Sequence, residues 1–538
     1  MNLSSHLVQR VLRLPPPLTR KVDLQRDLRV PMRDGVVLLA DRWAPQAPDG
    51  SLPMALVRTP YGRRGQLGGL FGRTLAERGF QVLVQSTRGT FGSGGVFDPM
   101  RREREDGLDT LDWVREQPWF GGSIVLTGPS YLGYVQWAMA GAFPPEVRAM
   151  IPLVTESALT LEFLRPDGLS LETPFGWGVM IAGQERRGAL ARQVLLNGKV
   201  RRALRTLPLG QADTAAIGHP SDYIQDILAH DADDPHWTAL DHRDQVARVT
   251  IPVSAIGGWY DIFLPGQLRD YEVLQAAGRT ARLTIGPWTH TSPGGFGSAM
   301  RETLGFALAH ARGEQPASRA RVRLFVMGEE AWRDFDAWPP PGYAASRLHL
   351  RPGGALASEP PAESAPDRYR YDPADPTPAA GGVRLSGKAG RVDNTDLEAR
   401  ADVLTYSTEP LTQDTEVIGK VSAEIWFRSS LPYADVFVRL CDVDPRGRSR
   451  NVCDGLVSLS GADRLSCATV RLWPTAHRFK AGHRIRVQVS SGAFPRYARN
   501  PGTGEPHATA VSLRAADQEV YHDPAHPSAV ILPARQFR

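Results

Sequence analysis

Three residues with the chemistry of a nucleophilic triad occur in the order Ser130, Asp261 and His290. A serine hydroxyl is a poor nucleophile until a histidine accepts its proton, and that histidine needs a carboxylate to fix its tautomer. Each residue lies just past a short apolar run that is typical of a buried strand. Each alone also has a structural interpretation, since serine and aspartate cap helices and the chain has 13 histidines. The hypothesis of a catalytic triad therefore depends on finding all three residues, in this order, each just after a predicted strand.

Ser130 lies in the stretch IVLTGPSYLGYVQWAM, residues 124–139, at the corner of a predicted strand–turn–helix. In that setting a serine hydroxyl projects above the sheet, and the amide that follows it can donate to an oxyanion. The usual pattern places a glycine two residues after the serine, whereas here Gly133 comes three residues after it. An ordinary strand-to-helix turn with a capping serine is the alternative interpretation.

Alternating strands and helices before residue 155 predict an α/β fold with a parallel sheet. Strands are expected at Val36–Trp43, Pro53–Val57 and Phe80–Gln85, with a hairpin turn at Asp34-Gly35. A helix is expected at Asp106–Gln117 because its apolar residues recur at helical spacing. The serine strand would follow this helix and belong to the same sheet.

The later chain changes character twice. Residues 155–247 are helix-like with proline breaks, and apolar strands resume before Asp261 and His290. Beyond residue 322, short alternating runs separated by Gly and Pro turns predict a two-sheet β-sandwich, with Glu416–Phe427 as one of the runs. The predicted domains are a discontinuous α/β catalytic domain (1–154 and 248–321), a helical cap over its mouth (155–247) and a β-sandwich domain (322–538).

The composition argues against several classes of protein. Hydrophobic residues at 42% and charged residues at 22% are typical of a globular protein. The net charge of +5 arises from 63 basic and 58 acidic residues that are interspersed, as in Arg101–Asp106, which favours a solvated surface over a nucleic-acid interface. No stretch approaches the ~18 apolar residues of a membrane span, and the first residues lack the apolar core of a secretory signal. A cytoplasmic protein is expected.

The cysteine and glycine patterns give no sign of a metal, cofactor or phosphate site. Cys441, Cys453 and Cys467 form no CxxC pair, which fits buried thiols in a reduced compartment better than disulfides or zinc. The glycine-rich segment Arg88–Gly95 lacks the Gly-Lys-Ser/Thr of a phosphate-binding loop, so a tight structural turn is favoured. The predicted partner is a small molecule. No cofactor, metal, nucleic acid or membrane is expected, and a homodimer stays open.

Six segments resemble one family in the same order: VPMRDGVVLLADRWAP, RTPYGRR, TRGTFGSGG, QPWFGGSIVLTGPSYLG, GGWYDIF and GPWTH. Together they resemble the cocaine-esterase and X-Pro dipeptidyl-peptidase family, often labelled CocE/NonD. Near the C-terminus, VRLCDVDPRGRS and FPRYARN resemble that family's jelly-roll domain. The resemblance implies an α/β-hydrolase core with a helical cap and a C-terminal jelly-roll sandwich. It also accounts for Gly133, since Gly-x-Ser-Tyr-x-Gly is the family's form of this turn.

By position, the resemblance implies roles for five residues. Ser130 would be the nucleophile, His290 the general base and then the acid, and Asp261 the orienting carboxylate. The Tyr131 amide and the Tyr61 hydroxyl would form the oxyanion hole. The place of Tyr61 in a loop after an early strand is consistent with this role, and a packing tyrosine is the alternative.

One position departs from the family's pattern. The family usually reads Asp-x-Arg-Gly before the glycine-rich turn, whereas this chain reads Ser86-Thr87-Arg88-Gly89. The lost carboxylate is expected to alter a structural hydrogen bond near Arg88 and to leave the chemistry unchanged.

Aromatic residues gather in and around the loops of the predicted site. Trp259, Phe263 and Trp288 lie close to the predicted acid and histidine, and Trp177 belongs to the helical segment. They are candidates for an apolar acyl or leaving-group pocket. Packing of the strand ends is the alternative for Trp259 and Trp288, so Phe263 is the preferred substrate contact.

The sequence predicts a serine hydrolase that cleaves a carboxylic ester through an acyl-enzyme. An X-Pro dipeptidyl-peptidase, an amide or β-lactam acylase and an acyl transferase are alternatives on the same scaffold. A peptidase of that type needs an acidic anchor for the substrate amine, and Glu156, Glu162, Glu172 and Glu185 are candidates. A non-catalytic carbohydrate-binding protein is the alternative from another class, against which the complete triad argues.

Overall fold

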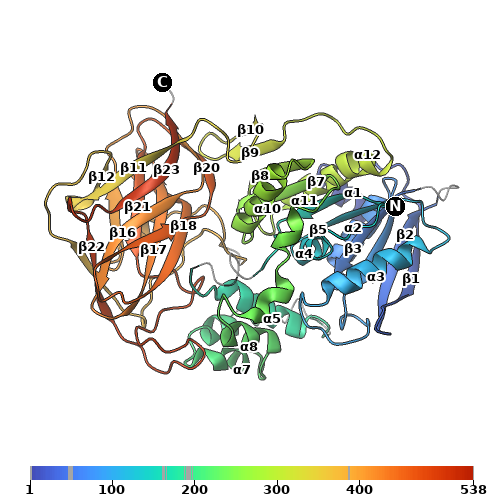
Figure 1. Ribbon diagram of the computed structural model, residues 1–538, viewed down its shortest axis with the longest axis horizontal. Coiled ribbons are helices and arrows are strands. Elements are labelled where there is room, and N and C mark those ends of the chain that lie inside the picture. Colours follow the sequence, from blue (N-terminus) through green and yellow to red (C-terminus); the bar gives the residue numbers. More distant parts are fainter. Residues whose placement is uncertain are drawn as a thin grey trace. The chain divides into compact units, whose positions relative to one another are not determined.

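The computed structural model describes residues 3–46, 52–159, 164, 167–186, 188, 196, 198–385 and 388–536. The chain divides into two compact units, whose elements are labelled in Figure 1. One unit contains residues 1–160, 235–323 and 334–336, and the other contains residues 161–234, 324–333 and 337–538. Residues 161–234 of the helical segment thus belong to the same unit as the C-terminal β domain, whereas residues 155–160 and 235–247 belong to the first unit, and the division into three domains stays a prediction.

The first unit is built on a mostly parallel sheet. Strands β1 to β8 run in the order β1-β2-β4-β3-β5-β6-β7-β8, with antiparallel pairs at β1/β2 and β2/β4 and parallel pairs from β4 onward. The strands are β1 (Val22–Pro31), β2 (Val37–Pro45), β3 (Met54–Thr59), β4 (Gln81–Ser86), β5 (Ile124–Pro129), β6 (Val147–Leu153), β7 (Val253–Tyr260) and β8 (Ala281–Thr289). The α/β class is confirmed, as is the Asp34-Gly35 hairpin, across which Pro31 pairs with Val37.

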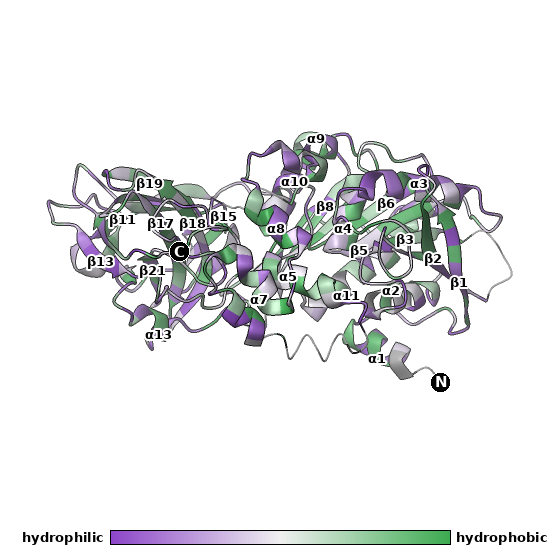
Figure 2. Ribbon diagram, turned by 90° about the horizontal axis from the view of Figure 1, so that it is seen from below, coloured by the Kyte–Doolittle hydropathy of each residue, from purple (hydrophilic) through white to green (hydrophobic). Residues whose placement is uncertain are grey.

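Helices cover this sheet on both sides. Figure 2 shows α3 and α10 on one side and α2 and α11 on the other. The helices are α1 (Leu3–Val11), α2 (Gln66–Ala76), α3 (Glu103–Arg115), α4 (Tyr131–Ala138), η3 (Pro235–Leu240), α9 (Arg243–Val246), α10 (Leu264–Ala276), α11 (Pro293–Glu302), η4 (Thr303–Ala307) and α12 (Leu308–Ala311). Because both faces are covered, β3, β4, β5 and β7 are buried along their whole length. Within the described ranges, no helix is long and apolar enough to cross a membrane.

The run Arg101–Asp106 at the start of α3 is only partly solvated, because Arg102 is exposed whereas Glu103 and Asp106 are buried. Glu103 is 4% exposed and Asp106 is 1% exposed. A carboxylate oxygen of Glu103 lies 2.9 Å from the guanidinium of Arg58, and Asp106 accepts hydrogen bonds of 2.6 and 3.0 Å from Arg88. These arginines come from β3 and from the loop after β4. A run of mixed charges looks solvated in the sequence because its partners lie elsewhere in the chain.

The second unit combines short helices with an antiparallel β domain. The helices are α5 (Glu172–Gly183), η2 (Leu209–Gln211), α7 (Ala212–Ile217), α8 (Asp222–Ala229), η5 (Pro352–Gly354) and α13 (Thr395–Glu398). The strands are β11 (Ala344–Arg351), β12 (Ala355–Ala357), β13 (Asp367–Tyr371), β14 (Leu404–Ser407), β15 (Thr415–Gly419), β16 (Ser422–Ser429), β17 (Tyr433–Val443), β18 (Ser449–Ser460), β19 (Ser466–Arg471), β20 (Thr475–Phe479), β21 (Arg484–Ser490), β22 (Ala516–Tyr521) and β23 (Ala529–Gln536). β9 (Val322–Val326) and β10 (Ala331–Phe335) lie where the chain passes between the units. The predicted all-β character of this region is confirmed.

One predicted strand of this domain is wrong. Glu416–Phe427, expected as a single run, is divided into β15 and β16 at Gly419, whose φ is 140°. β15 pairs with β20 and β23, whereas β16 pairs with β19, β22 and β23. Both parts pair antiparallel with β23 and so run in the same direction, but the chain bulges between them, since the five steps from Val417 to Ser422 face only three from Ala534 to Ile531. A glycine in the positive-φ region permits such a bulge.

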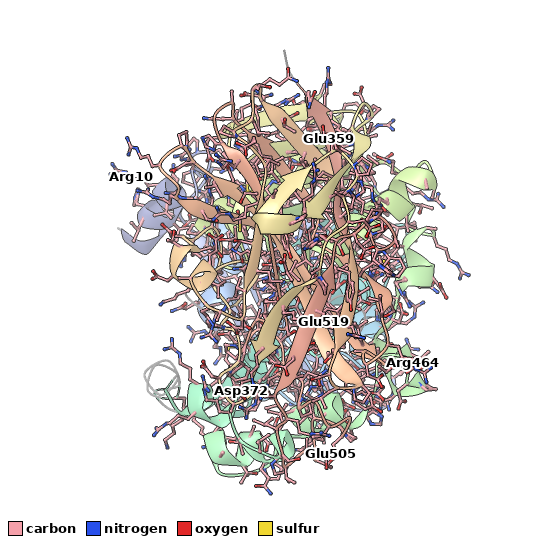
Figure 3. The ribbon with its side chains drawn as sticks, turned by 90° about the vertical axis from the view of Figure 1, so that its left-hand side faces the viewer. Arg10, Glu359, Asp372, Arg464, Glu505 and Glu519 are labelled. Carbon is pink, nitrogen blue, oxygen red and sulfur yellow. The ribbon has the colours of Figure 1, made fainter. Side chains whose placement is uncertain are left out.

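Glu519 on β22 is a surface carboxylate that bridges two arginines. Figure 3 labels it on the face of the β domain that is turned to the viewer. It lies 2.9 Å from Arg368 and 2.6 Å from Arg428, whose side chains are 71% and 47% exposed. Solvent screens such pairs, so their net contribution to stability is small.

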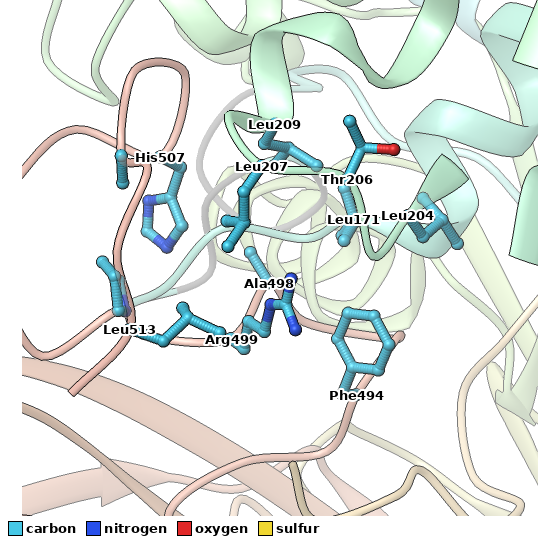
Figure 4. Close-up of a pocket in the computed structure, with 12 residues that line it drawn as sticks. Leu171, Leu204, Thr206, Leu207, Leu209, Phe494, Ala498, Arg499, His507 and Leu513 are labelled. Carbon is cyan, nitrogen blue, oxygen red and sulfur yellow. The ribbon is translucent and has the colours of Figure 1, made fainter. Parts of the chain in front are cut away.

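The helical segment packs directly on the loops of the β domain. The N–H of Leu171 donates to the Arg496 carbonyl at 2.8 Å, and the N–H of Gly210 donates to the Ala508 carbonyl at 3.0 Å. Residues of the helical segment and of the β-domain loops together line an apolar cavity of about 20 Å³, shown in Figure 4. Its lining includes Leu171, Leu204, Leu207, Leu209, Phe494 and Leu513. A shared apolar interior explains why the two parts form one compact unit.

The three cysteines are all free, as predicted, but they are not all buried. Cys441 and Cys453 lie inside the β domain, and burial raises the pKa of both thiols. Cys467 is exposed, so the expectation of a third buried thiol is wrong. It lies on β19, where alternate residues face solvent.

Asp454 on β18 is the buried counterpart of Glu519. It lies 3.0 Å from Arg439 and forms a second ion pair with Arg496. All three residues are at most 6% exposed. Burial alone would raise the pKa of Asp454, but Arg496 and Arg439 together hold it below its ordinary value. Removing this carboxylate would leave two arginines buried without their partner.

The substitution Asp454→Ala is expected to lower the free energy of unfolding by about 3–5 kcal/mol, the cost of breaking a buried ion pair from one side. The matched control is Glu519→Ala, which also removes a carboxylate between two arginines and is expected to cost at most ~1 kcal/mol. Urea titrations followed by circular dichroism measure both values. Equal losses in the two variants would contradict this account.

A buried histidine, His242, contacts a tyrosine of α4. The hydroxyl of Tyr134 on α4 lies 3.0 Å from Nε2 of His242, and the histidine is 8% exposed. Burial, with a smaller contribution from Arg104, lowers the pKa of His242 to about 4. The imidazole is therefore neutral in the folded protein at neutral pH.

This pKa predicts an acid-sensitive contribution to stability. An unfolded histidine binds a proton near pH 6.5, whereas the folded protein keeps His242 neutral down to about pH 4. The unfolded state therefore binds more protons in this window, and stability falls as the pH drops through it. As the pH falls from 6.5 to about 4, we expect the free energy of unfolding of His242→Gln to decrease by up to ~3 kcal/mol less than that of the unsubstituted protein. Urea midpoints of both proteins measured at several pH values test this. If the two midpoints change with pH in parallel, the lowered pKa of His242 is contradicted.

Candidate active site

Ser130 occupies a strained turn between β5 and α4. Its φ of 56° and ψ of −123° lie where non-glycine residues are rare, and its N–H donates to the Leu153 carbonyl at 2.9 Å. Its carbonyl accepts the N–H groups of Gly133 and Tyr134 at 2.8 Å. A β-carbon at Gly133 would lie 2.4 Å from Cγ2 of Thr155, so the glycine is needed for this close approach. The predicted strand–turn–helix is confirmed.

The parallel pair β7/β8 brings Asp261 and His290 together. Tyr260 and Thr289 are register partners at the ends of these strands, and Asp261 and His290 come next. Nδ1 of His290 lies 2.7 Å from Oδ2 of Asp261. Asp261 is fully buried, and its Oδ1 accepts the N–H of Phe263 at 2.9 Å. The carboxylate is thus fixed by its own loop and by the histidine.

Ser130 lies at the same edge of the sheet. β5, β6, β7 and β8 are parallel neighbours in that order, so their carboxyl ends lie at one edge. Ser130 follows β5, Asp261 follows β7 and His290 follows β8. Functional groups of open α/β sheets gather at this edge. The edge therefore carries a strained serine, an imidazole and a buried carboxylate.

Tyr61 follows β3, the other neighbour of β5, at this edge. It is half-buried, and its N–H donates to Oγ1 of Thr59 at 3.1 Å. Two residues later, the Arg63 guanidinium pairs with the fully buried Asp41 at 3.1 Å and with Asp27. The loop that carries Tyr61 is therefore held on both sides of the tyrosine.

Ser86, the departure from the family's pattern, contacts this anchor. Its Oγ accepts the N–H of Arg63 at 3.1 Å, and the Arg63 guanidinium approaches it at 3.4 Å. Arg88 instead pairs with the start of α3. The hydrogen bond at position 86 therefore involves Arg63 and not Arg88, and carboxylates from β1 and β2 supply the negative charge. The glycine-rich segment is a turn, closed by the N–H of Gly89 donating to the Gly94 carbonyl at 2.9 Å.

Tyr131, the first residue of α4, is tied to a carboxylate that sequence analysis missed. Its hydroxyl donates to Oε1 of Glu103 at 2.7 Å and accepts the N–H of Met100 at 2.8 Å. Burial raises the pKa of Glu103 although Arg58 opposes the shift, and burial with Glu103 raises the pKa of Tyr131 well above its ordinary value. The only signal in the sequence was an acidic residue in the first turn of a helix, which ordinarily indicates just a favourable dipole interaction.

The four aromatic candidates differ in their surroundings. The ring of Phe263 packs edge to face on His290, with 5.5 Å between centroids. Trp288 lies against two glycines, in β8 and α11, where an added β-carbon would come within 2.4 Å of its ring. Trp259 is 2% exposed. Trp177 belongs to the second unit, where its ring stacks edge to face on a tyrosine. Phe263 thus contacts the histidine directly, and substrate contact by any of the four stays a prediction.

The acidic candidates for a substrate anchor are also distinguishable. Glu172 pairs through both oxygens with Arg384, each at 2.6 Å. Glu156 is fully buried, 3.8 Å from an arginine of α10. Glu185 is exposed, and Glu162 lies outside the described residues. Glu172 is therefore engaged within its own unit.

Comparisons with known proteins give the family. A family model described as X-Pro dipeptidyl-peptidase (S15 family) matches residues 34–292, and one described as X-Pro dipeptidyl-peptidase C-terminal non-catalytic domain matches residues 317–531. Cocaine esterase from Rhodococcus sp. (strain MB1 Bresler) is 33% identical over 564 aligned residues, which cover 94% of this chain and 98% of that protein. A putative serine esterase from Mycobacterium bovis is 24% identical, with coverage of 94% and 95%.

Solved structures share the fold across both units. An aminopeptidase from a marine sediment Thaumarchaeota archaeon has a TM-score of 0.82 at 23% identity, with 96% of this chain and 98% of that chain covered. An α-amino acid ester hydrolase also has a TM-score of 0.82, at 22% identity, with coverage of 97% and 98%. The architecture is therefore an α/β-hydrolase domain followed by a C-terminal antiparallel β domain. With the esterase relative at 33% identity over nearly all of both chains, this chain belongs to the CocE/NonD family of serine hydrolases.

Proposed function

We propose that the chain is a carboxylesterase that works through an acyl-enzyme. Ser130 attacks the ester carbonyl, His290 takes the hydroxyl proton and gives it to the leaving alcohol, and Asp261 stabilises the imidazolium. The same imidazole then activates the water that releases the acid. The observation that carries the proposal is the 2.7 Å hydrogen bond between His290 and the buried Asp261, at the edge where Ser130 sits in its strained turn.

Three features of His290 support its role as the base. Its contact with Asp261 through Nδ1 favours the tautomer in which Nδ1 carries the proton and Nε2 accepts one. Its side chain is 10% exposed, so water for the second step can reach it. The edge-to-face packing of Phe263 restricts rotation of the ring. Nε2 is therefore the nitrogen that would accept the proton of Ser130.

The oxyanion would be held by the Tyr131 N–H and the Tyr61 hydroxyl. Tyr131 begins α4, where the first N–H groups have no acceptor within the helix and the dipole favours negative charge. Tyr61 comes from the loop after an early strand, the usual source of the second donor in this architecture. Each such donor is worth roughly 10²–10³ in turnover.

An ester is favoured over a peptide as the substrate. The cocaine esterase relative matches nearly the whole chain. An X-Pro dipeptidyl-peptidase, the second candidate, would need an open carboxylate for the substrate amine, and Glu172 is already paired with Arg384. Phe263 is the proposed contact for the acyl or leaving group, with Trp259 and Trp288 as further contacts.

The substitution Ser130→Ala is expected to abolish labelling by a fluorophosphonate probe and to lower ester turnover by about 10⁴-fold or more, because no other group supplies the nucleophile. Asp261→Asn is expected to lower turnover by about 10⁴-fold, because it favours the wrong histidine tautomer. The control is Ser460→Ala, an exposed serine of the β domain that should leave both readouts unchanged. Labelling that persists in Ser130→Ala would refute the nucleophile assignment.

The preference for esters can be measured with one chromophore. We expect p-nitrophenyl acyl esters to give a kcat/KM at least about tenfold above that of Gly-Pro-p-nitroanilide, because two of the candidate anchors for the dipeptide amine are already engaged, Glu156 by complete burial and Glu172 by its pair with Arg384. Turnover of Gly-p-nitroanilide serves as the control for the bond type alone. A clear preference for the dipeptide anilide would favour the peptidase instead.

A further inference from the structure

The two proposed oxyanion donors are connected by a chain of three buried side chains. Arg58 lies near the end of β3, three residues before Tyr61. Its Nη2 lies 2.9 Å from Oε2 of Glu103, and the other carboxylate oxygen of Glu103 accepts the Tyr131 hydroxyl at 2.7 Å. Arg58, Glu103 and Tyr131 are 1%, 4% and 3% exposed. The strand that leads to one donor is thus linked to the residue that carries the other.

Each member of this chain is held in more than one direction. Nη1 of Arg58 donates to the main-chain carbonyl of Glu103 at 2.8 Å, and Nε donates to Gln85 on β4 at 2.8 Å. The Tyr131 hydroxyl also accepts the N–H of Met100 at 2.8 Å. Neither the carboxylate nor the phenol can therefore shift without breaking a second contact.

We propose that Glu103 is a positioning residue of the oxyanion hole. Through the Tyr131 side chain it fixes the place of the Tyr131 N–H, and through Arg58 it fixes the distance of that N–H from the loop that carries Tyr61. The inference rests on the proposed function. Oxyanion donors act within about 2.7–3.1 Å of the developing charge, and a displacement of ~1 Å can cost about a hundredfold in rate.

Stability alone does not account for a charged chain at this place. Burying an ion pair carries a desolvation cost that often cancels its attraction, and apolar side chains of similar volume are commonly as stable. Apolar contacts, however, leave a ring free to slide along its own axis. Two hydrogen bonds at the phenol oxygen fix the outer end of the Tyr131 side chain, and so restrict the position of the main chain that carries the N–H.

The test uses Tyr131→Phe, which removes both hydrogen bonds and keeps the ring and the main-chain N–H. We expect kcat, per site titrated with a fluorophosphonate, to fall about ten- to a hundredfold while KM changes less than about twofold. The inhibition constant of a trifluoromethyl ketone, whose adduct places an oxyanion in the hole, should rise by the same factor. Glu103→Gln keeps an acceptor for the tyrosine and should show a smaller loss than Glu103→Ala.

The matched control is Tyr406→Phe, which removes a 2.8 Å hydrogen bond from a buried tyrosine to the half-buried Asp367 in the β domain and should leave both constants unchanged. The inference is overturned if Tyr131→Phe and Glu103→Ala lose titratable sites but keep kcat per site and the inhibition constant within about twofold of the unsubstituted protein. If Tyr131→Phe yields no titratable sites, Glu103→Gln is measured in its place, and values of kcat per site and of the inhibition constant within about twofold of the unsubstituted protein overturn the inference. Failure of the proposed function itself would appear differently, as an unsubstituted protein whose turnover does not depend on Ser130.

Discussion

The register between β7 and β8 is the constraint on which the candidate site depends. Tyr260 pairs with Thr289 at the strand ends, so the residues that follow them emerge at the same height. A slip of one residue in either strand would turn its side chains to the opposite face. The 2.7 Å contact between His290 and Asp261 would then be lost. The regular pairing of the two strands shifts between Gly258 and Tyr260, where β8 contains one residue more than β7, and this irregularity places Tyr260 opposite Thr289.

Around this edge, the protein places ion pairs in its interior. Glu103 faces Arg58, Asp106 faces Arg88 and Asp41 faces Arg63. Desolvating such charges costs several kcal/mol for each ion, which only well-formed pairs offset. These pairs fix positions: Glu103–Arg58 and Asp41–Arg63 each join a helix end or a loop to a strand, and Asp106–Arg88 joins α3 to the loop after β4. The loop of Tyr61 and the first turn of α4 are both held in this way.

The second unit is held together by apolar contacts between its helices and its β domain. Its helical segment has no sheet of its own and buries its leucines against the loops of the β domain, with main-chain hydrogen bonds from Leu171 and Gly210 at the contact. Inside the β domain, β19 has residues that face solvent, Cys467 among them, whereas β17 is buried from Ala434 onward, so Cys441 is buried. Residues 161–234 of this segment thus share apolar contacts with the β domain.

The sequence by itself determined the α/β class, the turn at Ser130, the strand ends that precede Asp261 and His290, and the all-β character of the C-terminal region. These are local properties, because strand periodicity, Gly-Pro breaks and the residue after a strand are read within a few positions. Only the tertiary structure decided that Glu103 is buried on Arg58, 45 residues away, and that Ser86 meets Arg63. Such contacts depend on which strands are neighbours. A one-dimensional pattern of charge does not contain that information.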